Sequence, residues 1–285
     1  MNEREIRLAL FCAIEGGSNF WGREISQYGV HEIHQRLAAR SYDPIKSAAI
    51  FEKFSQHSAT ETFTAIAAAN GQFFIPGDLN WPTKLDNLAV PPIGIIVRGN
   101  AEALNAPSLA IVGTRNPTPY GVRIAGDFAA GFVDRGWDIV SGGAYGIDTA
   151  AHRGALIAEG RTIAVIASGI DIAYPAGNSR LFEQICESGA IVSEVAPGSP
   201  ALPFRFLTRN RLIAALSQAT LVVEAAFRSG SLRTARDAAE LLRPVMAIPG
   251  AISSPSSEGC HRLIGERAAE IVTSVADCYE LISSL

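Results

Sequence analysis

From Ser108 onward the chain alternates between short apolar runs and longer amphipathic segments, and this alternation restricts the possible folds more than any other feature of the sequence. The apolar runs have the length of strands and occupy residues 108–113, 137–141, 162–167, 190–193, 220–224 and 244–248. The segments between them have the apolar spacing of helices, at 120–135, 147–159, 178–188, 209–218 and 231–242. The run at 162–167 is apolar at successive positions, which is typical of a parallel strand covered on both faces. The pattern predicts a Rossmann-like α/β fold, with an open, mostly parallel sheet and helices on both faces.

The first part of the chain has a different pattern. Apolar residues recur there at helical spacing in three segments, at 6–14, 31–37 and 44–54. Turn residues gather at 73–82 and mark a boundary. We therefore expect a small helical N-terminal domain at 1–72 and an extended Rossmann-like domain at 73–285.

Composition excludes several classes of protein. Of the 285 residues, 48% are hydrophobic and 18% are charged, which is ordinary for a folded globular chain and unlike a disordered one. No apolar run approaches the roughly 18 residues that a membrane helix needs. The first seven residues carry charges where a signal peptide would have an apolar core. We expect a cytoplasmic protein with no membrane partner.

The cysteines and the arginines are distributed in ways that bear on ligands. The four cysteines are far apart and form no Cys-x-x-Cys pair, so we expect no metal site, no disulfide framework and no cofactor. The net charge of −4 disfavours indiscriminate binding of nucleic acid. Residues 195–236 nevertheless hold six arginines against one acid, Glu224. Such a stretch favours a localised anion site.

The first apolar run of the alternating region breaks into a loop that carries Gly113, Thr114 and Arg115 before a helix begins. Backbone N–H groups and the positive end of a helix dipole converge at such a junction, and Arg115 adds donors that suit phosphate. The glycine spacing of a dinucleotide site and the Gly-Lys-Ser/Thr of a P-loop are both missing. The alternative is that Gly113 only allows a tight turn.

Several further loops are expected at the same edge of the sheet, because ligands of open α/β sheets bind beyond the carboxyl ends of the strands. Glycines that let a backbone approach phosphate and arginines that neutralise it converge there. The candidate DNA- or phosphate-binding residues are Gly113, Thr114, Arg115, Ser141, Gly142, Gly143, Arg205, Arg209, Asn210, Arg211, Arg228, Ser229 and Gly230. The glycines could instead form plain turns, and the arginines could be solvated on a helix surface.

Four titratable residues near these loops allow two interpretations each. Asp148 and His152 lie four apart near a helix start and could form an acid/base pair, or could cap and pack that helix. Glu194 and Glu224 lie where a catalytic carboxylate would be expected, or could anchor the arginines. The sequence does not decide between these roles.

The motifs together resemble the DNA-processing protein A (DprA/Smf) family, in order, from about residue 73 to 270. The resemblance is carried by Ile111-Val-Gly-Thr-Arg115, Ser141-Gly-Gly-Ala-Tyr-Gly-Ile-Asp-Thr-Ala-Ala-His152, Tyr174-Pro175, Ser193-Glu194, Arg209-Asn-Arg211, Ser229-Gly-Ser-Leu232, Pro249-Gly250 and Gly259-Cys260. It implies a non-enzymatic protein that binds single-stranded DNA, protects incoming DNA and loads the RecA recombinase in natural transformation and recombination. It also implies a homodimer. Arg115, the Ser141–Gly143 loop and the Arg209–Arg211 region would then contact DNA.

The chain departs from the family pattern at a few points. Leu207 follows Phe206 where the family usually has proline, and we expect no C-terminal winged-helix domain before the chain stops at Leu285. The alternative functions are a nucleotide phosphoribohydrolase-like enzyme or a nucleotide-sensing module on the same fold. The loop at 229–234 lacks the Pro-Gly-Gly-x-Gly-Thr pattern of those hydrolases. A binding protein is therefore favoured over an enzyme.

Overall fold

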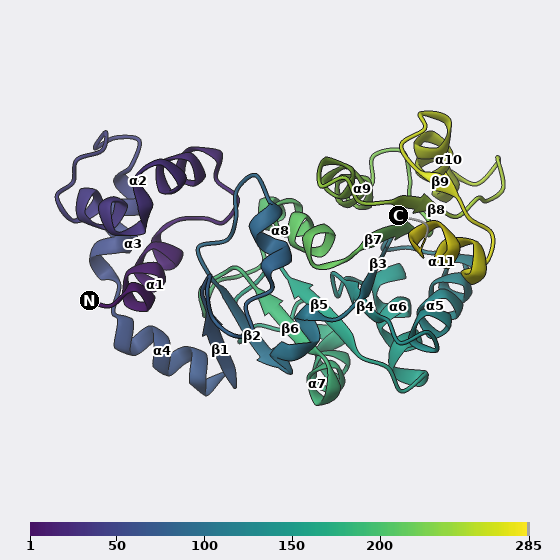
Figure 1. Ribbon diagram of the computed structural model, residues 1–285, viewed down its shortest axis with the longest axis horizontal. Coiled ribbons are helices and arrows are strands. Elements are labelled where there is room, and N and C mark those ends of the chain that lie inside the picture. The colour runs from purple at the N-terminus through teal and green to yellow at the C-terminus, as the bar shows by residue number, and fades with distance from the viewer. Residues whose placement is uncertain (284–285) are drawn as a thin grey trace.

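The computed structural model describes residues 1–283, and within that range the chain forms a nine-stranded sheet in the order β1-β2-β6-β5-β4-β3-β7-β8-β9 (Figure 1). The strands are β1 (Gly71–Phe74), β2 (Ile95–Gly99), β3 (Ser108–Val112), β4 (Asp138–Ser141), β5 (Thr162–Ile166), β6 (Ala190–Ser193), β7 (Ala219–Val222), β8 (Val245–Ala247) and β9 (Glu270–Ile271). All neighbours from β6 to β9 pair in parallel, whereas β1 and β2 are antiparallel at one edge. The predicted fold class is confirmed.

The helices lie at one end of the sheet and on its two faces. They are α1 (Glu3–Ala13), α2 (Asn19–Ala38), α3 (Ala48–Gln56), α4 (Ala59–Ala68), α5 (Pro119–Val133), α6 (Ile147–Ile157), α7 (Ser179–Ser188), α8 (Pro203–Leu216), α9 (Ser231–Glu240), α10 (Glu258–Gly265) and α11 (Val275–Ser283). Successive residues of β3 point to opposite cores: Ala110 and Val112 pack with α8 and α9, and Leu109 and Ile111 pack with α5 and α6. Burial of both faces explains the nearly continuous apolar runs.

Helix α8 begins earlier than the sequence pattern predicted. The expected helix starts at residue 209, but α8 starts at Pro203. Proline is favoured at the first helical position, where its fixed φ suits the helix and its missing N–H is not needed. Arg205 and Phe206 therefore belong to the helix rather than to the preceding loop.

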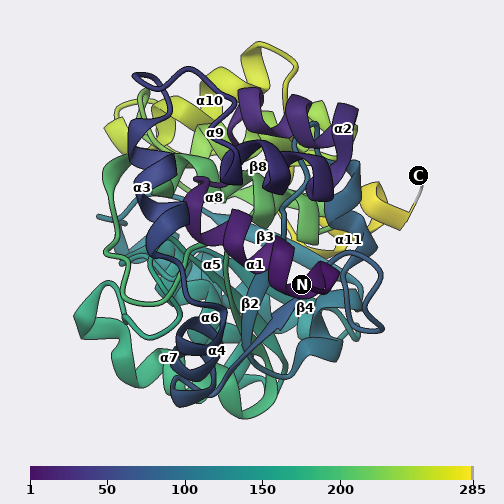
Figure 2. The same cartoon turned by 90° about the vertical axis from the view of Figure 1, so that its left-hand side faces the viewer.

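The N-terminal helices pack together and also against the sheet. Leu10, Trp21 and Ile33 share a core among α1, α2 and α3. On another side of α1, Leu8 and Phe11 join the core that covers β2 and β6. Figures 1 and 2 show these helices grouped at the β1 end, with β8 and β9 at the opposite end. No helix within residues 1–283 is long and apolar enough to cross a membrane.

The order of the strands reverses beside β3. The chain passes outward from β3 through β4 and β5 to β6, and then returns through α8 to β7 on the other side of β3. In open α/β sheets such a reversal leaves a crevice at the carboxyl ends of the two strands that flank it. The crevice here lies between the loops that follow β3 and β7.

His152 of α6 is an internal structural residue. It is fully buried, and its Nδ1 lies 2.7 Å from Thr162 Oγ1. Because the Thr162 hydroxyl donates to the carbonyl of Ile139, His152 Nδ1 is the donor to Thr162. Asp148 instead accepts a hydrogen bond from the Ala144 amide. The packing interpretation of His152 therefore holds, and the two side chains do not work as an acid/base pair.

We predict that His152 makes the stability of the protein depend on pH. Burial, followed by the charge of Arg209, lowers the pKa of His152 to about 3. An unfolded histidine has a pKa of about 6.5, so the unfolded chain binds a proton that the folded chain excludes. The contribution of His152 to the free energy of unfolding is complete above pH 6.5. It decreases by about 1.4 kcal/mol per pH unit as the pH falls toward 3.

Urea unfolding of the wild type and of His152→Asn at pH 7.0 and 5.5 measures this dependence. The wild type should lose more stability than the variant between the two values, since asparagine does not titrate. Equal losses in the two proteins would contradict the prediction.

Candidate nucleic-acid interface

A pocket of about 680 Å³ opens at the crevice between β3 and β7. Three segments supply most of its wall: the loop after β3, the pocket-facing side of α8, and the loop from β7 into α9. Eight of the residues singled out in the sequence line it, namely Gly113, Thr114, Arg115, Arg209, Asn210, Arg228, Ser229 and Gly230. Five others do not, namely Ser141, Gly142, Gly143, Arg205 and Arg211.

Arg115 is the exposed cation of the pocket. Its guanidinium lies 4.9 Å from the ring centroid of Phe206, and that ring lies 5.5 Å from the ring of Tyr174. Within residues 1–283 the Arg115 guanidinium forms no hydrogen bond or ion pair, so all its donors face solvent and the pocket. The three side chains form an aromatic and cationic wall in which the two rings are tilted by 56°. Arg228, across the pocket, is also exposed and unpaired among the described residues.

Arg209 is the buried cation of the pocket. Its Nη1 donates to the carbonyl of Val165 at 2.5 Å. Burial lowers the pKa of Arg209 to about 10, although the nearby charge of Asp148 opposes that shift. A Cβ at position 142 would overlap the Arg209 guanidinium, so Gly142 is required to make room for it. Gly142 thus leaves room for Arg209 and does not itself line the pocket.

The positive end of α5 is already occupied by a carboxylate of the protein. Glu224 accepts hydrogen bonds from the Thr118 amide at 2.9 Å and from the Thr118 hydroxyl at 2.6 Å. Thr118 is the N-cap of α5. The expectation that this helix end receives the phosphate of a ligand is therefore wrong, because Glu224 is the anion there. Glu224 caps a helix and anchors no arginine.

The polar groups of the glycine-rich turn after β4 also bond to other groups of the protein. The Ser141 hydroxyl donates to the Ile111 carbonyl at 2.6 Å, and Asp148 accepts from the Ala144 amide at 3.3 Å. Gly143 has φ +69° and packs against Phe182. Burial raises the pKa of Asp148. The turn holds the pocket in shape but turns its polar groups inward.

Helix α9, unlike α5, begins at the pocket with no carboxylate at its positive end. Its N-cap is Gly230, which gives no side-chain cap, and its first turn contains no acidic residue. Asn210 of α8 donates to the Gly230 carbonyl at 3.1 Å and fixes the loop. With the hydroxyls of Ser229 and Ser231 beside it, this positive helix end faces the pocket near Arg228.

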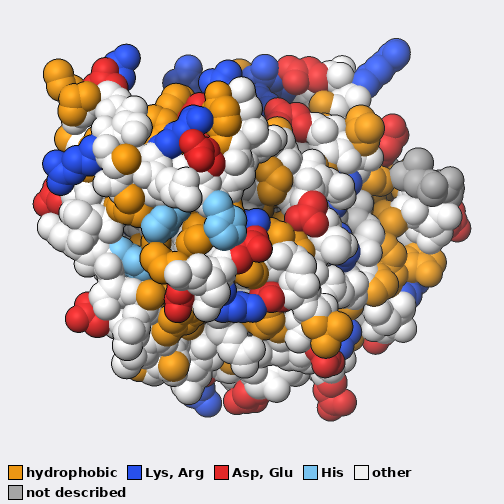
Figure 3. All heavy atoms as spheres, turned by 60° about the vertical axis from the view of Figure 1, so that its left-hand side comes forward, with side chains coloured by type: hydrophobic (Ala, Val, Ile, Leu, Met, Phe, Trp, Pro, Cys, Tyr) orange, Lys and Arg blue, Asp and Glu red, His pale blue; other side chains and the backbone are white. Residues whose placement is uncertain are grey.

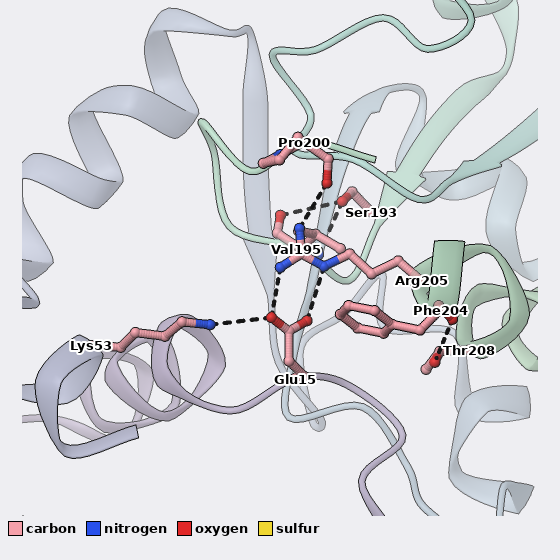
Figure 4. Close-up of polar contacts among 8 residues, drawn as sticks. All are labelled: Glu15, Lys53, Ser193, Val195, Pro200, Phe204, Arg205 and Thr208. Carbon is pink, nitrogen blue, oxygen red and sulfur yellow. Dashed lines mark hydrogen bonds and ion pairs between the residues drawn. The ribbon is translucent and has the colours of Figure 1, made fainter. Parts of the chain in front are cut away.

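Arg205 and Arg211 are engaged away from the pocket. Arg211 donates to both oxygens of Glu194, at 2.5 and 2.6 Å, so Glu194 does anchor an arginine. Arg205 forms a two-pronged ion pair with Glu15 (Figure 4). Sequence reasoning missed Phe206 and Glu15. The helical spacing of Phe206, Arg209 and Asn210 could have revealed the first, had the helix been started at Pro203.

On the face formed by the N-terminal helices, acidic and basic side chains are interspersed among hydrophobic ones and histidines (Figure 3). Within residues 1–283 no group of three or more His, Cys, Asp or Glu side chains could hold a metal ion. The pocket at the crevice therefore combines free guanidinium groups, a helix start without a carboxylate and aromatic rings, which suits a ligand with phosphates and bases.

Comparisons with known proteins agree with this chemistry. The family model for DNA recombination-mediator protein A matches residues 72–283. A putative DNA processing protein DprA of Mycobacterium tuberculosis is 38% identical over 264 residues, covering 85% of this chain and 68% of that protein. The solved DNA processing protein A of Streptococcus pneumoniae superposes with a TM-score of 0.83 and 34% identity over 98% of both chains.

A second solved structure extends the comparison. The DNA processing protein A of Helicobacter pylori, described for its single-stranded DNA binding mode, has a TM-score of 0.67 and 29% identity, covering 76% of this chain and 96% of that one. The resemblance that the motifs indicated is thus confirmed: this chain belongs to the DNA recombination-mediator protein A family of DNA processing proteins, the DprA/Smf family.

Proposed function

We propose that this protein binds single-stranded DNA in the pocket between β3 and β7, protects incoming DNA, and loads the RecA recombinase in natural transformation and recombination. The observation that carries the proposal is the unpaired Arg115 stacked on Phe206 beside the buried Arg209. Phosphates of a strand pair with guanidinium groups, while bases stack on rings.

The pocket supplies both kinds of contact. Arg115, Arg228 and the start of α9 would receive phosphates, and Thr114, Asn210, Ser229 and Gly230 would set their position. The rings of Phe206 and Tyr174 would receive bases, each worth roughly 1–3 kcal/mol. Arg205 and Arg211 are not proposed as contacts, because their carboxylate partners already hold them.

Binding is proposed to leave the DNA chemically unchanged, in line with relatives that are named as DNA processing proteins. The carboxylates near the pocket have other tasks: Glu224 caps α5, Glu194 holds Arg211, and Asp148 holds the turn after β4. Each of these carboxylates thus has a structural contact within the protein. This separates the proposal from a nucleotide hydrolase.

The proposed setting follows from this activity. RecA would contact a surface other than the pocket, and the protein would act in the cytoplasm, where it meets RecA. We also propose that residues 1–72 and 73–285 are its two domains. The described N-terminal helices share a core of their own, although α1 also packs on the sheet.

A homodimer is proposed through the β8–β9 end of the sheet. Leu242 is 94% exposed, Ile252 is 94% exposed and Ile271 is 52% exposed in segments that flank β8 or form β9. Met246 of β8 is fully buried and packs against Cys278, so it is not part of this surface. Apolar side chains exposed at a sheet edge favour pairing of two copies about a two-fold axis.

Arg115→Ala and Arg228→Ala should each weaken binding of an oligothymidine about tenfold, because each removes a charged phosphate contact. Each should also lower the magnitude of the salt slope by roughly 0.7. Arg153→Ala, an exposed arginine of α6 outside the pocket, is the control and should change neither. Unchanged affinity and slope in folded Arg115→Ala would place the site elsewhere.

Single strands should be preferred over duplex at about 150 mM salt. A flexible single strand can bend into the pocket and stack its bases on Phe206. A rigid duplex reaches only the outer arginines, and salt screens the attraction between these arginines and its phosphates. Competition between a single strand and its blunt duplex measures the preference, and the recovered DNA and added mononucleotides should be intact. Equal affinity, or release of a free base, would refute the proposal.

Light scattering at micromolar protein should give a mass twice the 30.2 kDa of one chain. Leu242→Glu should shift the mass toward the monomer, since it places a charge in the proposed interface. The control is Ile157→Glu, which changes an equally isolated apolar residue on α6, 83% exposed. A monomeric wild type would rule out the dimer.

A further inference from the structure

Helix α8 has two faces with different tasks. Phe206, Arg209 and Asn210 face the pocket, as their spacing of three and four residues requires. Arg205 lies beside Arg209 on the adjoining side of the helix, where both line a small cavity with Glu15, and it contacts the segment that follows α1. One rigid helix thus connects the pocket to the N-terminal part of the chain.

A two-pronged ion pair between Glu15 and Arg205 ties the segment that follows α1 to α8. Arg205 Nε lies 3.0 Å from Glu15 Oε2, and Arg205 Nη2 lies 2.6 Å from Glu15 Oε1. The Arg205 side chain is only 9% exposed. Lys53 of α3 adds a third bond to Glu15 at 3.2 Å (Figure 4). Burial opposes ionisation of Glu15, but Arg205 and Lys53 outweigh it and lower the pKa of Glu15.

The two glycines after Glu15 bring the chain against the same face of α8. A Cβ on Gly16 would overlap the Glu194 carboxylate, and one on Gly17 would overlap Thr208 and Arg211. Gly17 also has φ +71°, which side chains rarely adopt. The segment is therefore shaped to lie directly on α8 and on the Glu194–Arg211 pair.

The Arg205 side chain ties the first turn of α8 to the neighbouring segments. The N-cap of α8 is Leu202, which gives no side-chain cap. The third nitrogen of Arg205, Nη1, donates to the Pro200 carbonyl at 2.8 Å and ties down the loop before the helix. Glu15 thus orients the guanidinium that holds both the loop and the first turn, and Phe206 lies in that turn.

We propose that Glu15 is a positioning residue for the single-stranded DNA site: through Arg205 it fixes the first turn of α8, so that Phe206 meets Arg115 in the geometry that binds DNA. The proposal rests on the proposed function. Because coupling between two contacts is reciprocal, bound DNA strengthens the seating of residues 15–17 on α8 by the same factor.

Electrostatics alone makes the opposite prediction. Glu15 is an anion held against α8, the helix that forms part of the pocket wall, so removing its charge should strengthen DNA binding if charge were its only effect. A positioning role predicts weaker binding instead, with an unchanged salt slope because no phosphate contact is lost. Whether DNA affinity rises or falls when the Glu15 charge is removed therefore distinguishes a purely electrostatic effect from a positioning role.

Glu15→Gln tests the proposal, with Arg4→Gln as its control. Arg4 of α1 forms an ion pair with Asp78 that also joins the N-terminal helices to the rest of the chain, but it does not touch α8. Affinity for an oligothymidine should fall at least about fivefold in Glu15→Gln, with the wild-type salt slope, and stay unchanged in Arg4→Gln. In an Arg205→Gln background, Glu15→Gln should have no further effect.

Hydrogen exchange in the DNA-free proteins provides an independent measurement. Amides in the first turns of α8 should exchange faster in Glu15→Gln than in the wild type or Arg4→Gln, and DNA should slow exchange at residues 15–17 of the wild type. Unchanged or stronger DNA binding by folded Glu15→Gln would overturn this proposal alone. A wild type that binds no single-stranded DNA would overturn the proposed function as well.

Discussion

The burial of one guanidinium, that of Arg209, organises the whole crevice. Moving a charge out of water costs several kcal/mol unless partners satisfy it. Here the Val165 carbonyl at the end of β5 receives a hydrogen bond, Asp148 at the start of α6 supplies the opposite charge, and Gly142 after β4 leaves the space. The loop after β4, strand β5 and helix α6 are thus arranged around the Arg209 side chain, which α8 supplies.

Anions of the protein occupy two of the places where sequence patterns locate a ligand. A strand, a glycine and a helix start attract negative charge whatever its source. Glu224 fills that place at α5, and Asp148 holds the amide side of the turn after β4. The helix start that has no carboxylate is that of α9, whose first turn contains no acidic residue. A local signature therefore identifies an anion site but not which anion fills it.

The same reasoning separates what the sequence could predict from what it could not. The sheet followed from apolar runs, because periodicity is a local property of the chain. Arg115 and Arg228 were found because loops at parallel strand ends must meet. The partners of Arg205 and Arg211 escaped prediction, because Glu15 is 190 residues from Arg205 in sequence and no spacing rule connects them. Ion pairs of that range depend on how helices dock on the sheet.

The position of α8 explains why distant residues bear on the pocket. It is the crossover from β6 to β7, so it begins at the carboxyl ends of the strands and crosses one face of the sheet to the amino end of β3, where Ser108 bonds to Leu216. Its first turns lie between the crevice and the N-terminal segment. The departure from the family pattern at Leu207 fits this arrangement. Leucine has the backbone N–H that proline lacks, and at the fifth residue of a helix that begins at Pro203 this N–H can bond to the first carbonyl. The early turn of α8 is continuous as a result, and a restraint at Arg205 reaches Phe206 and Arg209 through the helix itself.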